Sequence, residues 1–160
     1  MNPKYEKALF AAGCFWGIEQ AFYKTPGVIE TRVGYSGGQS ENPTYEQVSS
    51  HKTGHAETVE VTFDPQETSY EKLLEVFWKI HNPTTLNRQG LDIGSNYRSA
   101  IFYLNDQQKE TAEKSKAELE KSGKFKKPIV TKITKASAFW PAEDYHQKYF
   151  LSHPHLACPI

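Results

Sequence analysis

Short apolar runs with polar neighbours recur along the first two thirds of the chain. Alternating or continuous apolar positions predict four β-strands, at Leu9–Ala12, Val28–Tyr35, Ala56–Phe63 and Ser99–Leu104. Helical spacing lies between them, from about Phe15 to Tyr23 and from a Thr68/Glu71 capping box through Ile80. The resulting order, β-α-β-β-α-β, predicts an α+β protein, a two-layer α/β sandwich with a ferredoxin-like core.

The last third of the chain adds elements around this core. We expect a charged surface helix capped by Asp106, a strand from Ile129 to Thr134 and a short helix from Glu143 to Leu151. The segment 152–160 holds two prolines and Cys158, so we expect an irregular, mobile tail. No repeat or linker divides the sequence, and its 160 residues suit a single catalytic domain, 1–160.

Two long segments without strong periodicity, 36–55 and 82–98, hold many of the Gly, Asn, Pro and Tyr residues. Long structured loops in a compact domain often carry function. In the first loop, Thr44 and Gln47 have the spacing of a capping box, which predicts a short helix with Tyr45 in its first turn. The Tyr45 phenol then either donates a hydrogen bond into a site or packs against the protein.

The run Gly13-Cys14-Phe15-Trp16-Gly17 stands where the first predicted strand passes into the first helix. A sulfur at a helix start meets unpaired backbone N–H groups and the positive end of the helix dipole, which favour thiolate over thiol. Cys14 is therefore a candidate nucleophile, with an aromatic wall beside it and glycines that allow close approach of a substrate. These five residues also fit an inert cysteine buried beside two core aromatic side chains.

The third predicted strand carries a carboxyl group on its apolar face. Val59, Val61 and Phe63 share that face by strict alternation, and Glu57 falls on it while Glu60 points the other way. A buried carboxyl without a cationic partner has a raised pKa and can act as a general acid near neutral pH. The strand alone also fits a solvated Glu57 at a frayed strand end.

Charge and cysteine content exclude several classes of protein. Lys plus Arg and Asp plus Glu number 19 each, so no net charge attracts nucleic acid or an anionic membrane. Two cysteines, Cys14 and Cys158, are too few for the disulfide framework of a small secreted domain, which favours the reducing cytoplasm. His153, His155 and Cys158 are a weak zinc signal, so we expect no metal.

Several of these stretches together resemble the A-type peptide methionine sulfoxide reductases. The match runs from Cys14 through Pro141-Ala142-Glu143-Asp144-Tyr145-His146-Gln147. Four motifs stand in the order and at the spacing of that family: Gly13 to Gly17, Asn42 to Tyr45, Gly54-His55-Ala56-Glu57, and Asp92 through Tyr97-Arg98-Ser99. The resemblance implies reduction of the S epimer of methionine sulfoxide, free or in proteins, with no metal or organic cofactor.

The resemblance also implies the role of each candidate residue. Cys14 is the nucleophile, Phe15 and Trp16 hold the S-methyl group, and Glu57, Tyr45 and Tyr97 surround the sulfoxide oxygen, with Asp92 positioning substrate or a water. Thiolate attack with a proton from Glu57 releases methionine and leaves a sulfenic acid on Cys14. Cys158 then forms a disulfide with Cys14, which thioredoxin reduces. We expect a monomer that repairs proteins in oxidative stress.

The chain departs from the family at residues 48–50, in the tail and at two asparagines. Where many members carry additional cysteines, it has Val48-Ser49-Ser50 and a tail with Cys158 alone, so there is one recycling candidate. It also has Asn82 where Asp is common and Asn96 where Gln is common.

Two other functions fit parts of the sequence. A cysteine-dependent hydrolase or acyl transferase needs a histidine such as His55 or His146 beside Cys14. An activity whose pH dependence follows the titration of that histidine would favour this function. A redox-sensing or methionine-binding module switches through Cys14 and Cys158 without turnover.

Overall fold

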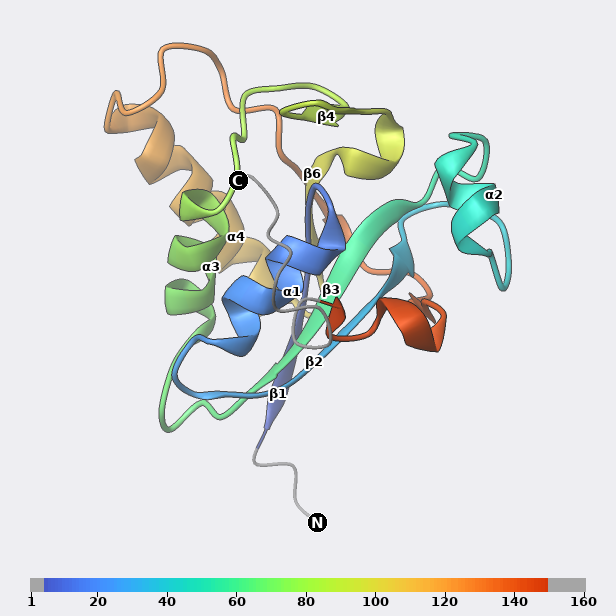
Figure 1. The fold of residues 1–160 in the computed structure, drawn as a ribbon. Helices are drawn as coiled ribbons and strands as arrows, with labels where there is room; N and C mark the ends of the chain where they lie inside the picture. Colours follow the sequence, from blue (N-terminus) through green and yellow to red (C-terminus); the bar gives the residue numbers. More distant parts are fainter. Residues whose placement is uncertain (1–4, 150–160) are drawn as a thin grey trace.

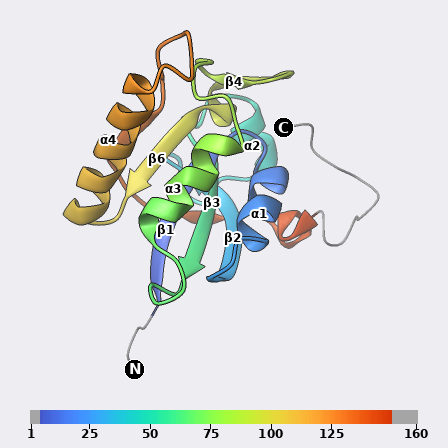
Figure 2. The same cartoon turned by 90° about the vertical axis from the view of Figure 1, so that its left-hand side faces the viewer.

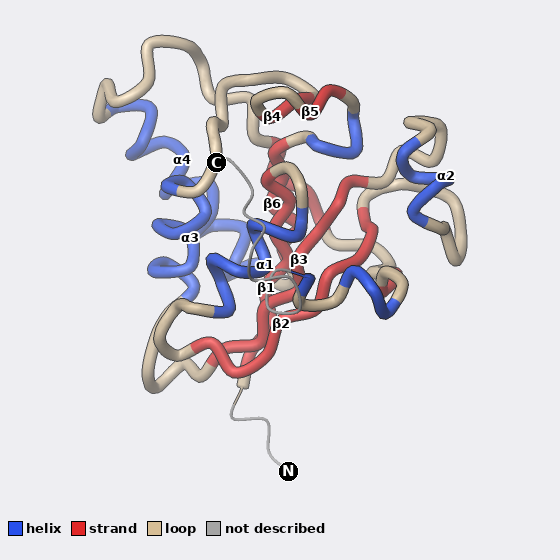
Figure 3. Tube along the Cα trace, in the orientation of Figure 1, coloured by secondary structure: helices blue, strands red, loops and turns tan. Residues whose placement is uncertain are grey.

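The computed structural model describes residues 5–149. Its centre is a six-stranded sheet in the order β7-β6-β1-β3-β2-β8 (Figures 1 and 3). The strands are β1 (Glu6–Ala12), β2 (Val28–Ser36), β3 (Ala56–Phe63), β6 (Ser99–Tyr103), β7 (Lys132–Lys135) and β8 (Trp140–Pro141). Neighbouring strands are antiparallel except β6 and β7, which are parallel.

The four inner strands, in the order β6-β1-β3-β2, are joined by two helical crossovers. α1 (Phe15–Tyr23) connects β1 to β2, and α3 (Tyr70–Lys79) leads from β3 towards β6. Each connection skips one strand of the sheet, which is a split βαβ arrangement. The predicted α+β class is confirmed, and the strand order agrees with the predicted core.

Helices α1, α3 and α4 (Asp106–Lys121) lie on one side of the strands (Figure 2). Alternate side chains of the inner strands, such as Phe10, Val61 and Phe63, point to this side and pack with helix residues such as Phe22 of α1 and Phe77 of α3. A smaller cluster on the other face contains Leu9, Ala11, Ala56, Ala100 and Phe102. The alternation of β1 and β3 thus decides which side chains enter which cluster.

The first long loop carries the predicted short helix, α2 (Tyr45–Ser49). The Thr44 hydroxyl accepts the Gln47 N–H and the Gln47 side chain accepts the Thr44 N–H, so the capping box is confirmed. The second loop holds a hairpin of β4 (Arg88–Gln89) and β5 (Asp92–Ile93), followed by the 3₁₀ turn η1 (Ser95–Tyr97). Strands of two residues are too short for their alternation to be visible in the sequence.

Several predicted caps and boundaries are wrong. The N-cap of α3 is Ser69, whose hydroxyl accepts the Lys72 N–H, rather than Thr68. Asn105, not Asp106, caps α4 by accepting the Gln108 N–H. In each case the polar residue at the neighbouring position has the extended backbone that an N-cap needs.

The predictions at the end of the described chain also need correction. The strand expected at 129–134 is β7, which runs from Lys132 to Lys135. Of the helix expected at 143–151, residues 144–146 form the 3₁₀ turn η2 (Asp144–His146), a turn follows at 147–148, and Tyr149 is helical, while residues 150 and 151 lie outside the described residues. Lys148 has φ +51°, which interrupts a helix.

Between residues 5 and 149, no helix is both long and apolar enough to cross a membrane.

Candidate active site

Cys14 lies in the turn between β1 and α1. Gly13 has φ +108°, and a Cβ at this position would lie 2.7 Å from the Gln89 side chain, so the turn requires glycine. Cys14 occupies the N-cap position of α1, and its carbonyl accepts the Ile18 N–H at 3.4 Å. The half-buried thiol therefore lies at the positive end of a nine-residue helix, which favours the thiolate.

Glu57 lies at the start of β3, beside the first turn of α1. It is 2% exposed, as the alternation of the strand predicts, and its Oε1 accepts the backbone N–H of Phe15 at 3.2 Å. Glu60 points to the other face of the sheet, where it accepts the Arg32 Nε–H. This burial excludes the alternative of a solvated Glu57. The carboxyl group is bonded to the backbone N–H of Phe15, the residue that directly follows Cys14.

Two phenols, Tyr45 at the start of α2 and Tyr97 at the end of η1, face the same centre. Burial is the main cause that raises the pKa of each phenol, and Glu57 in its ionised form raises it further. A negative charge on Cys14 adds to the effect at both phenols. Both therefore keep their protons at neutral pH and can donate hydrogen bonds.

A cavity of about 440 Å³ lies beside Cys14. Its walls include Asp92 of β5 and the apolar side chains of Ile80 and Phe125. The charge of Asp92 also contributes to the raised pKa of Tyr97, so this carboxylate faces the same centre. The structure thus brings together five of the residues singled out in the sequence: Cys14, Glu57, Tyr45, Tyr97 and Asp92.

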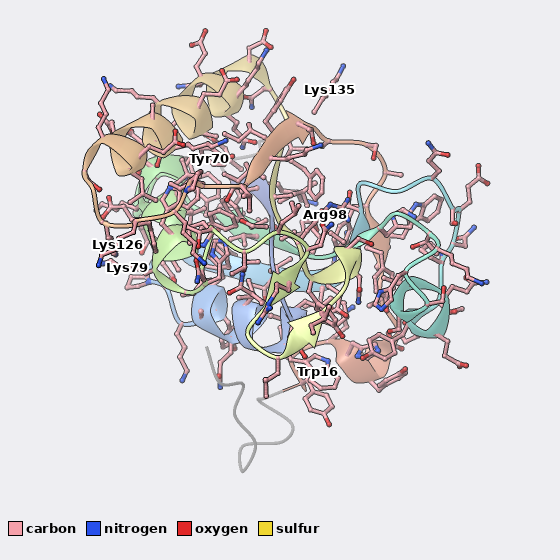
Figure 4. All side chains as sticks on the ribbon, turned by 90° about the horizontal axis from the view of Figure 1, so that it is seen from above. Trp16, Tyr70, Lys79, Arg98, Lys126 and Lys135 are labelled. Atoms are coloured by element: carbon pink, nitrogen blue, oxygen red, sulfur yellow. The ribbon has the colours of Figure 1, made fainter. Side chains whose placement is uncertain are left out.

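The two aromatic residues after Cys14 differ in exposure. Phe15 is 1% exposed, and its ring packs against Tyr35 and His146 in the core. Trp16 is half-buried and lies at the edge of the molecule in the view of Figure 4. Trp16 therefore offers the more accessible apolar surface, while Phe15 belongs to the packed interior.

Glu143 connects α2 to the sheet. Its Oε1 accepts the Tyr35 hydroxyl and its Oε2 accepts the Tyr45 backbone N–H, both at 3.0 Å. Burial opposes ionisation of Glu143, but these hydrogen bonds and the nearby His146 outweigh it and lower the pKa. Glu143 is thus an ionised anchor that holds the first turn of α2, and with it Tyr45.

Two further anchors hold the chain after η2. The Gln147 side chain bonds both the N–H and the C=O of Val33 on β2, each at 2.9 Å. The Lys148 N–H donates to Glu19 of α1, whose buried carboxylate also accepts the Thr31 hydroxyl. The segment 143–149, which we call the anchoring segment, is thereby fixed to α1, α2 and β2.

The histidines proposed for a hydrolase have other partners. His55 Nδ1 accepts the Gly38 N–H at 3.1 Å, and its Nε2 donates to the Ser40 carbonyl at 2.7 Å. His146 Nδ1 accepts the indole N–H of Trp16 at 2.9 Å. These hydrogen bonds weigh against either imidazole acting as the base for Cys14. Cys158 and the rest of the tail lie outside the described residues.

The sequence did not predict which residues hold the segments around the site in place through hydrogen bonds. Glu143 and Gln147 belong to the motif at 141–147, but that motif does not reveal their partners on α2 and β2. Glu19 had a local signal, because it follows Phe15 by four positions and precedes Phe22 by three, which places it on the buried face of α1.

A family model described as peptide methionine sulfoxide reductase matches residues 6–160. Two proteins named peptide methionine sulfoxide reductase MsrA are similar in sequence. That of Methanosarcina acetivorans is 65% identical over 145 residues, which cover 91% of this chain and 77% of the relative. That of Methanothermobacter thermautotrophicus is 58% identical over 155 residues, which cover 97% of this chain and 92% of the relative.

Two solved structures of Mxr1 from Saccharomyces cerevisiae are similar in fold. The reduced form has a TM-score of 0.92 and 33% sequence identity, and the match covers 99% of this chain and 92% of that one. A structure of Mxr1 in complex with Trx2 has a TM-score of 0.66 and 25% identity, with 99% of this chain and 89% of that one covered.

Proposed function

Because the chain belongs to the peptide methionine sulfoxide reductase A family, we propose that it reduces the S epimer of methionine sulfoxide, in proteins and as the free amino acid, at Cys14. Reduction of methionine sulfoxide is the activity of the family, and the epimer and the residue roles are proposals. The epimer is what the resemblance to the family implies, and the observation that carries the residue roles is the convergence of Glu57, Tyr45, Tyr97 and Asp92 on the sulfur at the start of α1.

The first step is attack of the Cys14 thiolate on the sulfur of the sulfoxide. The helix start stabilises the thiolate, which is the nucleophilic form. Trp16, backed by the core residue Phe15, offers apolar surface to the S-methyl group. The cavity beside Cys14 provides room for the remainder of the substrate.

The sulfoxide oxygen becomes a good leaving group only when it is protonated. Glu57 supplies that proton as general acid, and the protonated phenols of Tyr45 and Tyr97 donate hydrogen bonds to the same oxygen. Asp92 positions the substrate or a water from the cavity wall. The attack joins Sγ of Cys14 to the sulfur of the substrate, and the protonated oxygen then moves as a hydroxyl group to Sγ. The S–O bond of the substrate and the new Sγ–S bond both break in this transfer, so methionine leaves and Cys14 becomes a sulfenic acid.

Recycling uses the second cysteine. The Cys158 thiol attacks the sulfenic acid on Cys14, water leaves, and a disulfide joins the two sulfurs. Two thiols of thioredoxin then reduce the disulfide by exchange. Mxr1, whose fold is similar to that of this chain, has been solved in complex with Trx2, and that complex supports thioredoxin as the reductant. We further propose a single catalytic domain that acts as a cytoplasmic monomer in protein repair, which gel filtration and cell fractionation test.

An assay with epimer-resolved methionine sulfoxide and dithiothreitol tests the proposal. We expect consumption of the S epimer alone, with methionine as product. Cys14→Ser abolishes this activity because a hydroxyl is a far weaker nucleophile near neutral pH. Equal use of both epimers would contradict the proposed specificity, and wild-type activity in Cys14→Ser would place the nucleophile elsewhere. Ester hydrolysis with a histidine-governed pH profile would favour the hydrolase instead.

A further inference from the structure

The Trp16 indole has one polar group, and that group has a specific partner. The indole N–H can only donate a hydrogen bond, and it donates to Nδ1 of His146 at 2.9 Å. Nδ1 therefore carries no proton, so the proton of the neutral imidazole lies on Nε2. Burial lowers the pKa of His146, against the opposing charge of Glu143, which maintains this acceptor at neutral pH.

The aromatic rings around His146 leave it little freedom to move. His146 is 1% exposed, and its ring centroid lies 4.5 Å from that of Tyr45 and 5.3 Å from that of Phe15. The Trp16 ring is in turn stacked on Tyr149, with centroids 3.9 Å apart and planes 10° from parallel. One face of the indole is thus covered, and the hydrogen bond fixes the rotation of the ring within its plane.

Both groups that hold Trp16 belong to the anchoring segment. His146 stands between the anchors Glu143 and Gln147, and Tyr149 follows Lys148, which is bonded to Glu19. These anchors join the segment to α2, β2 and α1. The orientation of Trp16 is therefore set by a segment that lies 130 residues further along the chain.

We propose that His146 is a positioning residue that orients the Trp16 indole for the S-methyl group of the substrate. The proposal rests on the proposed function, because it concerns the wall against which that methyl group lies. An indole free to rotate about its side-chain bonds presents the same area on average, but it loses part of the binding energy in becoming ordered.

The test compares His146→Phe with His146→Asn. Phe keeps an aromatic ring and removes the acceptor, so we expect the KM for methionine sulfoxide to rise about five- to tenfold, with the single-turnover rate at saturating substrate nearly unchanged. Asn places its Oδ1 near the position of Nδ1 and restores most of the KM. Tyr145→Phe is the matched control, since Tyr145 is the 62% exposed neighbour and keeps its ring.

A double-mutant cycle separates positioning from general support of the fold. Trp16→Phe removes the donor, so His146→Phe has no further effect on KM in that background if it acts through the indole N–H. The same loss in both backgrounds overturns the proposal. Wild-type kinetics in His146→Phe also overturn it.

A readout without substrate keeps the proposal testable if His146→Phe fails to fold. In ¹⁵N-histidine spectra of the wild type, we expect an unprotonated Nδ1 and a protonated Nε2 at His146, and the opposite tautomer overturns the proposal. If the tautomer is as expected but no sulfoxide is reduced by the wild type, the proposed function fails. In that case the role of His146 in orienting Trp16 for a substrate falls with it, while the hydrogen bond stands.

Discussion

Glu57 is the residue on which the proposed proton supply depends. Glu57→Gln keeps the shape of the side chain and the carbonyl oxygen that accepts the Phe15 N–H, but removes the transferable proton. We expect the rate of the chemical step to fall by roughly two to four orders of magnitude, with a much smaller change in substrate binding. Single-turnover measurements by rapid quench separate these quantities. A rate within a few-fold of the wild type would transfer the acid role to Tyr45, Tyr97 or water.

The sequence predicted the burial of Glu57 but not the hydrogen-bond partners of Glu143, and the difference lies in the neighbours of each residue along the chain. Strict alternation along β3 was enough to predict the burial of Glu57, because strand neighbours fix the direction of a side chain. Glu143 has no such pattern, since its partners, Tyr35 and Tyr45, are about a hundred residues away in the chain. Partners brought together by tertiary packing leave no local periodicity to read.

His81 joins three segments of the fold through hydrogen bonds. Its Nδ1 donates to the Phe77 carbonyl of α3 at 2.6 Å, and its Nε2 accepts from the Ser99 hydroxyl of β6 at 2.7 Å. The Ser99 hydroxyl is also bonded to Thr131, just before β7. Burial lowers the pKa of His81 to about 4, although the bond to Phe77 opposes this.

This buried imidazole makes the stability of the fold sensitive to acid. Above pH 6.5 the imidazole is neutral in both folded and unfolded chains, so it adds no pH dependence. Between pH 6.5 and about 4 only the unfolded chain takes up the proton, so the free energy of unfolding falls by up to about 3 kcal/mol. Urea unfolding at pH 7 and pH 4.5 measures the loss. We expect the free energy of unfolding of His81→Gln to fall clearly less between pH 7 and pH 4.5. An equal fall in the variant would assign the acid sensitivity to other groups.

For the helices, the sequence pattern predicted the presence of each element better than the residue at which it begins. The capping box at Thr44 was correct because both of its partners lie within three residues. The caps of α3 and α4 were each displaced by one residue, since adjacent polar residues such as Thr68 and Ser69 differ only in backbone conformation. The β4–β5 hairpin went undetected because its position depends on contacts with residues such as Gly13 rather than on a pattern of its own.

Repeated turnover of the whole molecule depends, in the proposed scheme, on Cys158. We expect Cys158→Ser to reduce about one sulfoxide per enzyme, because the proposed chemical step needs Cys14 and its proton donors alone. With thioredoxin it then stalls, and the sulfenic acid is trapped by dimedone and detected by intact mass. Dithiothreitol partly restores turnover, because a small thiol can reach Cys14 directly. Cycling with thioredoxin at the wild-type rate would contradict the recycling scheme.

The order of the inner strands follows from the succession of elements in the sequence, because β-α-β-β-α-β has few ways to close a sheet. The sheet edges do not follow in the same way. β7 begins three residues later than predicted, and β8 is only two residues long. Edge strands receive pairing from one side only, so their limits are set by the neighbouring strand rather than by their own composition.

The aromatic and aliphatic composition of the main core has a consequence for the protein's own exposure to oxidants. The chain contains a single methionine, Met1, so Phe, Leu, Ile and Val fill the positions where a flexible thioether is often used. Peroxide converts buried methionines into polar sulfoxides that disrupt packing, and this core offers none.

We therefore expect the Cys14→Ser/Cys158→Ser variant to regain its full free energy of unfolding after it is treated with peroxide in urea and refolded. Adding Leu74→Met, a conservative change in the core, makes refolding sensitive to the same treatment. Loss of stability in the variant without the added methionine would contradict this expectation. We therefore expect a protein that repairs methionine to remain folded under the same oxidant that creates its substrate, because its core holds no methionine to be oxidised.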